Sequence, residues 1–181
     1  AICGTTFYKQ LFVTEIFMTQ KLYANPLLDV KNEHAFTAAE QKDGTLHVTY
    51  YNRKDVAIIR EIIDPTEKMV LEGYELNAAG KPAGRYHLFH PNSLLHISGT
   101  RQENGVFCGE YIEFYDNAQI KMSGVRTPRG IFIGTCQTFY KNGNPDEVAT
   151  LNMVGDMVGG YKKYAEDGKL LHHNFRDPLG N

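Results

Sequence analysis

Residues 105–134 read GVFCGEYIEFYDNAQIKMSGVRTPRGIFIG, and this stretch begins and ends on a glycine pair of the form G-x-x-x-G. The same pair recurs every 25 residues, which identifies an internal repeat. The chain has 17 glycines in 181 residues, and chance placement would not put eight of them into two regular columns. The eight repeat glycines are Gly80, Gly84, Gly105, Gly109, Gly130, Gly134, Gly155 and Gly159.

Other side chains follow the same period between the glycine pairs. A column of rings consists of Phe89, Phe114, Phe139 and Tyr164. A second column, with one exception to its rings, consists of Tyr86, Tyr111, Cys136 and Tyr161. Polar turn residues form a third, which consists of Asn92, Asn117, Asn142 and Asp167. A fourth column consists of Leu95, Ile120, Pro145 and Leu170. Each unit therefore reads G-x-Y-x-x-F-x-x-N-x-x-L.

The turn residues indicate that one unit is a β-hairpin. Asn142-Gly143 and Asp167-Gly168 predict two-residue type I′ turns, because both central positions of such a turn need positive φ. Asn92-Ser93 and Asn117-Ala118 lack the glycine and predict longer turns or turns of another type. Two strands and two turns account for 25 residues at about 3.3 Å per strand residue. We expect hairpins to pair side by side and stack their ring columns, with the glycines bending the backbone or lying beneath rings.

These patterns predict a mainly β fold, an elongated single-layer antiparallel meander of repeated β-hairpins. Residues 80–176 carry four repeats, residues 43–79 carry divergent hairpins, and residues 177–181 form a tail. Residues 1–42 form a separate N-terminal segment. A helix over about residues 6–23 would cap the sheet, although the alternation from Phe12 to Met18 also fits a strand.

Composition excludes several classes of protein. Apolar residues make up 42% and charged residues 22%, which is typical of globular domains. A net charge of -2 and a pI near 6.4 argue against nucleic-acid binding. No apolar run reaches the ~18 residues that a membrane-spanning helix needs. Cys3, Cys108 and Cys136 lack metal-ligand spacing and are expected to be buried or incidental thiols.

The units resemble the MORN-like repeat in its bacterial variant form, Y-x-x-Y/F-x-x-N/D-G-x-L/I. The best matches are residues 161–170 (YKKYAEDGKL), 109–118 (GEYIEFYDNA) and 134–144 (GTCQTFYKNGN), within a resemblance that covers about residues 73–175. Ser93, Ala118 and Pro145 depart from the pattern, and Trp is absent. Proteins similar to this mostly serve as interaction scaffolds, some dimerising and some associating with membranes. Many bacterial members carry a toxin–antitoxin label, which no residue here requires.

The sequence contains no recognisable catalytic or cofactor motif. His87, His90 and His96 lie close together, as do His172 and His173, but strand alternation would point near neighbours to opposite faces and away from a shared metal. Acidic groups such as Glu110, Glu113 and Asp116, or Asp64, Glu67 and Glu72, fit solvated strand faces. No phosphate-binding loop, dinucleotide fingerprint or nucleophile elbow is present. We therefore expect no enzyme activity, no metal and no cofactor.

The leading hypothesis is a repeat module for binding a protein partner or for self-association through open sheet edges. Tyr111, Tyr115 and Tyr140 are the candidate partner-binding residues, because tyrosine is enriched at interfaces. A scaffold on a membrane surface is the alternative, and a hydrolase or carbohydrate-binding protein is a third. The basic residues are interpreted as a solvated face; they include Lys121, Arg126, Arg129, Lys141, Lys162 and Lys163. The compartment is left open, secretion and the periplasm included.

Overall fold

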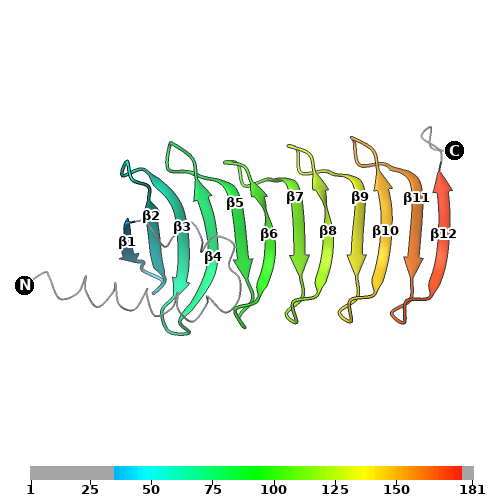
Figure 1. The fold of residues 1–181 in the computed structure, drawn as a ribbon, viewed down its shortest axis with the longest axis horizontal. Coiled ribbons are helices and arrows are strands. Elements are labelled where there is room, and N and C mark those ends of the chain that lie inside the picture. Colours follow the sequence, from blue (N-terminus) through cyan, green and yellow to red (C-terminus); the bar gives the residue numbers. More distant parts are fainter. Residues whose placement is uncertain (1–34, 177–181) are drawn as a thin grey trace, which may run out of the picture. The chain divides into compact units, whose positions relative to one another are not determined.

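A computed structural model of the protein describes residues 35–176, which form an all-β fold. Twelve strands make one open antiparallel sheet in chain order (Figure 1). This confirms the predicted antiparallel meander of hairpins; the expected helix over residues 6–23 and the tail over 177–181 lie outside the described residues. The strands are β1 (Ala35–Glu40), β2 (Leu46–Tyr51), β3 (Ala57–Asp64), β4 (Met69–Leu76), β5 (Pro82–Phe89), β6 (Leu95–Arg101), β7 (Phe107–Phe114), β8 (Ile120–Arg126), β9 (Phe132–Phe139), β10 (Pro145–Leu151), β11 (Met157–Tyr164) and β12 (Leu170–Arg176).

The chain divides into two compact units, Ala1–Leu95 and His96–Asn181. The sheet starts earlier than the predicted hairpins, since β1 lies within the segment assigned to residues 1–42. β1 pairs with β2 from Ala35↔Tyr51 to Glu40↔Leu46. No helix in the described part of the chain is long and apolar enough to span a membrane.

The hairpin turns are not the type I′ turns that the sequence predicted. In the turn after β9, the Tyr140 amide donates to the Asn144 carbonyl, and the Gly143 amide donates back to the Tyr140 carbonyl. Gly143 has φ 88°, whereas Asn142 is not among the residues with positive φ. This is a three-residue loop that ends in a left-handed glycine, so a single position needs positive φ.

Ser93 and Ala118 adopt the same three-residue turn without glycine, so these turns are longer than type I′ turns, as expected, but do not differ from the turns that contain glycine. Each has φ 65°. The turn bonds are also the same, since the Tyr115 amide donates to Gln119 at 2.8 Å and the Ala118 amide to Tyr115 at 3.0 Å. A residue with a side chain pays roughly 1–2 kcal/mol for this left-handed backbone conformation. The strand register of the repeat therefore imposes the conformation on Ser93 and Ala118 against their own backbone preference.

Exchanging the residue at this turn position is expected to change stability in opposite directions in two hairpins. Ala118→Gly should raise the free energy of unfolding by roughly 0.5–1 kcal/mol, because relief of the left-handed strain exceeds the added entropy of the unfolded chain. Gly168→Ala should lower it by about 1 kcal/mol, since Gly168 has φ 85° and only Asn144 side-chain atoms, at 3.7 Å or more, near an added Cβ. Urea titration of both variants and the wild type measures the two shifts. Equal effects of the two substitutions would contradict the turn assignment.

The second glycine of each pair lies inside a strand, at a bulge. Gly99 of β6 pairs with Tyr111, yet the next residue, Thr100, pairs with Cys108, so the register shifts where Gly109 lies. Gly109 has φ 72° and open space around an added Cβ. The glycine is therefore needed for backbone conformation, and the bulge bends the strand at each repeat.

Aromatic rings lie over Gly99 and Gly124, and not over the repeat glycines as expected. An added Cβ at Gly124 would come within 2.9 Å of the Phe132 ring, and one at Gly99 within 3.1 Å of the Phe107 ring. Neither glycine belongs to the two repeat columns. The repeat glycines thus shape turns and bulges, while Gly99 and Gly124 make room for rings.

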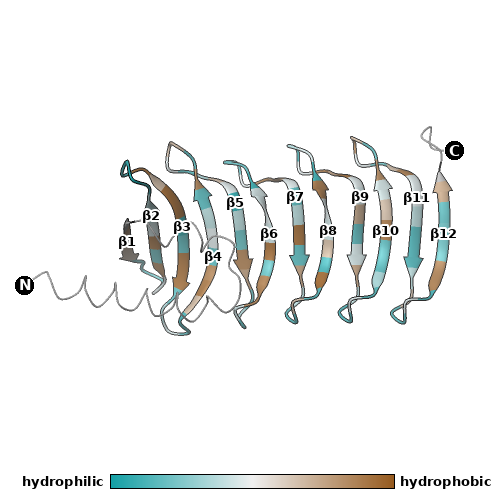
Figure 2. Ribbon diagram, viewed as in Figure 1, coloured by the Kyte–Doolittle hydropathy of each residue, from teal (hydrophilic) through white to brown (hydrophobic). Residues whose placement is uncertain are grey.

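The buried core of the first unit lies on one face of its sheet. The pairs Leu46↔Ile63, Val48↔Glu61 and Tyr50↔Ile59 place these residues on the same side. Val48 and Ile63 are fully buried, and apolar residues mix with polar ones along the strands (Figure 2). The core cluster comprises Leu46, Val48, Tyr50, Ile59, Ile63, Val70 and Phe89.

Candidate functional site

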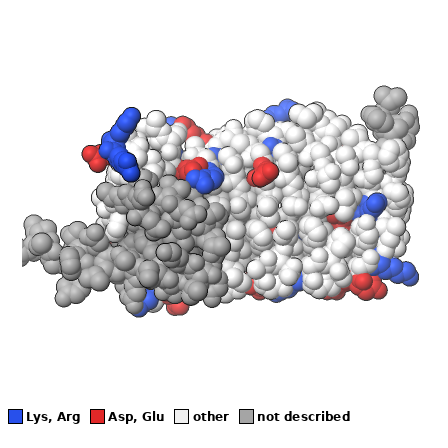
Figure 3. Space-filling model, in the orientation of Figure 1, with Lys and Arg blue, Asp and Glu red and all other residues white. Residues whose placement is uncertain are grey.

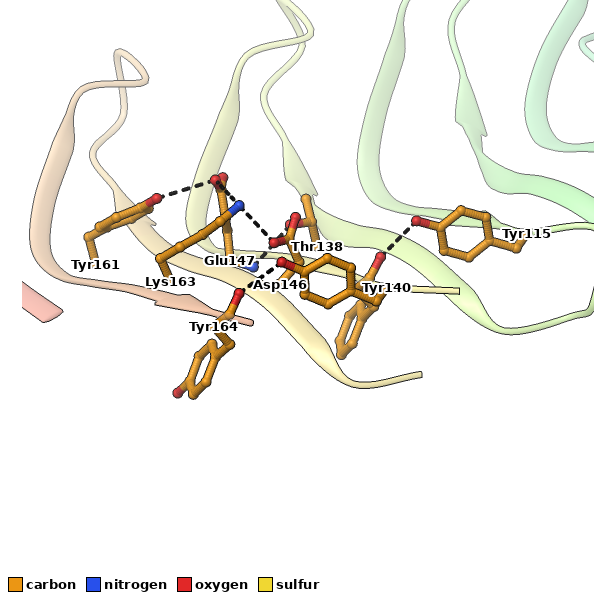
Figure 4. Close-up of polar contacts among 9 residues, drawn as sticks. Tyr115, Thr138, Tyr140, Asp146, Glu147, Tyr161, Lys163 and Tyr164 are labelled. Carbon is orange, nitrogen blue, oxygen red and sulfur yellow. Dashed lines mark hydrogen bonds and ion pairs between the residues drawn. The ribbon is translucent and has the colours of Figure 1, made fainter. Parts of the chain in front are cut away.

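Two of the three predicted partner-binding tyrosines connect successive hairpins of the second unit. The Tyr115 hydroxyl donates to the Phe139 carbonyl, and the Tyr140 hydroxyl donates to the Tyr164 carbonyl, both at 2.8 Å (Figure 4). Each bond spans 24 residues, so one repeat is tied to the next. Ala165 occupies the next position of this column, where the series of tyrosines stops. The hydroxyls of Tyr115 and Tyr140 therefore hold hairpins together, and only their rings are available to a partner.

Asparagine side chains at the turns form a second set of links between successive hairpins. Asn117 Nδ2 donates to the Lys141 carbonyl, and Asn142 Nδ2 donates to the Glu166 carbonyl, both at 2.8 Å. These bonds satisfy turn carbonyls that would otherwise face water. The asparagine column identified in the sequence thus joins neighbouring turns in addition to shaping each turn.

Tyr111, the third predicted partner-binding residue, is buried with 6% exposure. Its ring meets those of Phe107 and Phe132 edge-on, at centroid distances of 5.2 and 5.9 Å. The Arg126 guanidinium lies 4.3 Å from the Tyr111 centroid and 4.1 Å from that of Phe132, which is cation–π geometry. Burial, followed by the charge of Glu113, raises the pKa of the Tyr111 hydroxyl. Phe107, Phe132 and Arg126 were not singled out as ring partners, although Phe107 and Phe132 are 25 residues apart.

A β-bulge in β10 brings two acidic side chains to one face of the sheet. Pro145 pairs with Phe139 and Glu147 with Thr138, so Asp146 is an extra residue between two consecutive residues of β9. In a regular strand Asp146 and Glu147 would point to opposite faces. Here both reach Lys163 Nζ, at 2.7 Å and 2.9 Å (Figure 4). The bulge re-aims the aspartate and creates a cluster around one ammonium group.

Neighbouring side chains complete this cluster. The Tyr161 hydroxyl donates to Glu147 Oε1 at 3.2 Å, and the Glu147 amide donates to Thr138 Oγ1 at 3.1 Å. Thr138 Oγ1 also lies 3.4 Å from Asp146 Oδ2. β9, β10 and β11 therefore each contribute to one polar network.

The preceding hairpin repeats the arrangement with the charges reversed. Lys121 is the extra residue of β8, because Glu113 pairs with Met122 and Phe114 with Ile120. Its Nζ contacts Glu113 Oε1 at 2.7 Å, and His96 Nε2 lies 3.6 Å from the same oxygen. The hydrogen bond to Glu113 raises the pKa of the Lys121 ammonium. A cation thus occupies the bulge of one hairpin and an anion that of the next.

A groove of about 250 Å³ lies between these two bulges. We call it the bulge groove; Lys121 and Asp146 stand among its walls, with Thr138 between them in the strand order. It therefore offers charges of both signs beside aromatic surface. The lining residues are Tyr115, Lys121, Met122, Thr138, Phe139, Asp146 and Glu147.

Asp146 in the groove and Lys163 beside it stay charged near neutral pH. Burial raises the pKa of Asp146, but hydrogen bonds, of which that from Lys163 is the largest, outweigh it and leave the pKa below its ordinary value. Hydrogen bonds to Asp146 and Glu147 raise the pKa of Lys163. A general acid working near pH 7 would need the opposite shift in its carboxyl group. The pKa shift of Asp146 is in the opposite direction from the one that role needs.

The Asp146–Lys163 contact predicts an acid-sensitive contribution to stability. Because the folded pKa of Asp146 lies below its ordinary 3.8, the contribution is present above about pH 4 and is lost as the pH falls through the folded pKa. The difference in unfolding free energy between wild type and Asp146→Asn should therefore be largest at about pH 6 and shrink towards about pH 2.5. Urea titrations across this range test it, with Lys163→Met as the control background in which the dependence is reduced, because Tyr140 and Thr138 still lower the pKa of Asp146. A difference that stays constant with pH would contradict the assignment.

Two sequence interpretations change in this unit. Lys163 was assigned to a solvated basic face, but it is held by two carboxylates, and Arg126 lies against two rings. The sequence analysis did not identify the cluster of Asp146, Glu147 and Lys163. The bulge adds a residue to the strand without changing the 25-residue spacing of the repeat. On the face that Figure 3 shows, Lys, Arg, Asp and Glu side chains are scattered among residues of other kinds.

The first unit holds a buried acidic residue that the sequence did not reveal. Glu61 is fully buried and accepts a 3.0 Å hydrogen bond from the Tyr50 hydroxyl. Burial, and then the charge of Glu61, raises the pKa of Tyr50. Nearby, Tyr86 donates to Glu72 at 2.7 Å. These pairs lie within the packing of the sheet.

The histidines of the described residues do not form a metal centre. His87 is buried in β5, His96 lies near Glu113 in β6, and the ring of His172 lies 6.1 Å from that of Tyr161. Over residues 35–176, no group of three or more His, Cys, Asp or Glu side chains could hold an ion. Cys108 and Cys136 are half-buried free thiols, and burial raises the pKa of Cys136.

No protein-family model matches the chain, and no curated protein matches it significantly.

Proposed function

We propose that this chain is a non-enzymatic repeat module that binds an extended segment of a protein partner in the bulge groove. The observation that carries the proposal is the pair of bulges at Lys121 and Asp146, which turn charges of opposite sign onto one face beside Tyr115 and Phe139. Polar groups placed around aromatic surface are typical of protein interfaces. The resemblance to MORN-like repeats supports the same function, since such proteins mostly serve as interaction scaffolds.

The ion pairs of the groove favour binding over catalysis. Asp146 and Glu147 share Lys163, and Glu113 holds Lys121, so each carboxylate already has a cation beside it. Charged side chains of a partner strand can replace one member of each ion pair at little cost, because a surface ion pair contributes only about 0–1 kcal/mol to stability. Charge pattern would then select the partner.

Site-specific photo-crosslinking in the native cell tests this proposal. A benzophenone side chain at Met122, which lines the groove, should capture one discrete protein. The matched control is Val125 on the same strand; it is 42% exposed and pairs with Glu110, whereas Met122 pairs with Glu113, so the two lie on opposite faces. Identical products from both positions, or none from Met122, would refute groove binding. Asp146→Lys should then remove the captured product while circular dichroism shows the fold retained.

A further inference from the structure

β12 is an edge strand whose exposed side chains are unusually apolar. It pairs with β11 and has no second neighbour in the part of the sheet that the structure describes. Leu170, Leu171 and Phe175 are 48%, 59% and 73% exposed. Natural edge strands are commonly blunted by Lys, Pro or acidic side chains, but residues 170–175 contain none of these.

The repeat shows how the same positions are filled in interior strands. One period earlier, the positions of Leu170, Leu171 and Phe175 hold Pro145, Asp146 and Thr150. Two periods earlier, in interior strand β8, they hold Ile120, Lys121 and Val125, all exposed, so only Leu171 replaces a charged residue of both strands. In β10 the equivalent side chains are partly buried, whereas in β12 they are exposed.

The register of β12 makes it complementary to itself. Leu170, His173 and Phe175 pair with Tyr164, Lys162 and Gly160, alternate residues of β11, so all three share one face. Leu171 is the extra residue of a bulge, because Tyr164 pairs with Leu170 and Lys163 with His172. An antiparallel copy of β12 related by a two-fold axis at His173 would therefore place Leu170 opposite Phe175 twice, once on each side of the axis.

We propose that two copies of this chain associate through β12, antiparallel and about a two-fold axis at His173. Backbone groups on the open side of β12 then complete a hydrogen-bonded ladder, and two Leu170–Phe175 contacts cover the apolar side chains. His172 and Asn174 oppose each other on the other face. A single strand pair is smaller than the roughly 800 Å² per partner of standard stable interfaces, so the dimer is weak and concentration-dependent. This assembly is separate from partner binding in the bulge groove.

Sedimentation of the full chain over a range of concentrations tests the association. Wild type should show a monomer–dimer equilibrium, and Phe175→Lys should raise its dissociation constant at least about tenfold, because the symmetric contact carries the change twice. Val125→Lys is the matched control at the same repeat position in an interior strand and should leave the equilibrium unchanged. A wild type that stays monomeric at all concentrations, or equal loss in both variants, would overturn the proposal.

Disulfide trapping tests the two-fold axis itself. In His173→Cys the two introduced thiols should oxidise to a disulfide between chains, since directly opposed residues of an antiparallel pair are about 4.5–5.5 Å apart at Cα, within disulfide range. Lys162→Cys, on the adjoining inner strand, should not form such a link. Mass spectrometry of the linked peptide separates it from links through Cys3, Cys108 or Cys136. A dimer without this link, or open-ended polymers, would refute the two-fold arrangement, and neither result bears on crosslinking from Met122.

Discussion

Replacing Tyr111 with alanine should lower the free energy of unfolding by about 3–5 kcal/mol, the range for truncating a buried aromatic side chain. The ring is 6% exposed and lies between Phe107 and Phe132, with the Arg126 guanidinium 4.3 Å from its centroid. Loss of the ring would leave a cavity and remove one of the two stacking surfaces of Arg126. Urea or thermal unfolding of the purified chain measures the change.

Tyr111→Phe separates packing from recognition by the hydroxyl. It keeps the ring and should cost no more than about 1 kcal/mol. If Tyr111→Ala left stability unchanged and abolished partner capture, then Tyr111 would be a binding residue after all, as the sequence analysis expected.

The second large effect is expected in the first unit. Ile63 is fully buried in the core, whereas Ile120 is 37% exposed. Ile63→Ala should cost about 2–5 kcal/mol, and the chemically identical Ile120→Ala should cost about 0.5 kcal/mol or less. Because the same atoms are removed, the difference reports burial alone. Guanidinium titrations of both variants measure it, and equal costs would contradict the assignment of the core to the first unit.

The hairpin architecture could be predicted because its signal is a backbone requirement. Gly105 and Gly130, like the other repeat glycines, adopt positive φ, and few other residues do so easily, which leaves a periodic mark in the sequence. The turn type could not be predicted in the same way. An Asn-Gly pair fits both a two-residue turn and the end of a three-residue loop, and only the bond from the Tyr140 amide to Asn144 distinguishes them.

The bulge groove lay beyond sequence reasoning for a different reason. Strand alternation places Asp146 and Glu147 on opposite faces, and one extra residue reverses that assignment without altering the repeat length. Tyrosines posed a similar problem. Tyr111 and Tyr115 look equivalent as hydroxyl-bearing rings, yet one is buried among rings and the other bonds the next hairpin.

Excision of one repeat tests most directly whether 25 residues are one structural unit. Deleting residues 112–136 joins Tyr111 to Gln137, which occupies the same repeat position as Ile112, so every later side chain keeps its face. Deleting residues 112–135 joins Tyr111 to Cys136 and moves the rest of the strand to the opposite face. We predict that the longer deletion, of one whole repeat, retains a β-sheet circular dichroism spectrum and cooperative unfolding, and that the deletion one residue shorter loses both. Equal behaviour of the two shortened chains would contradict the account.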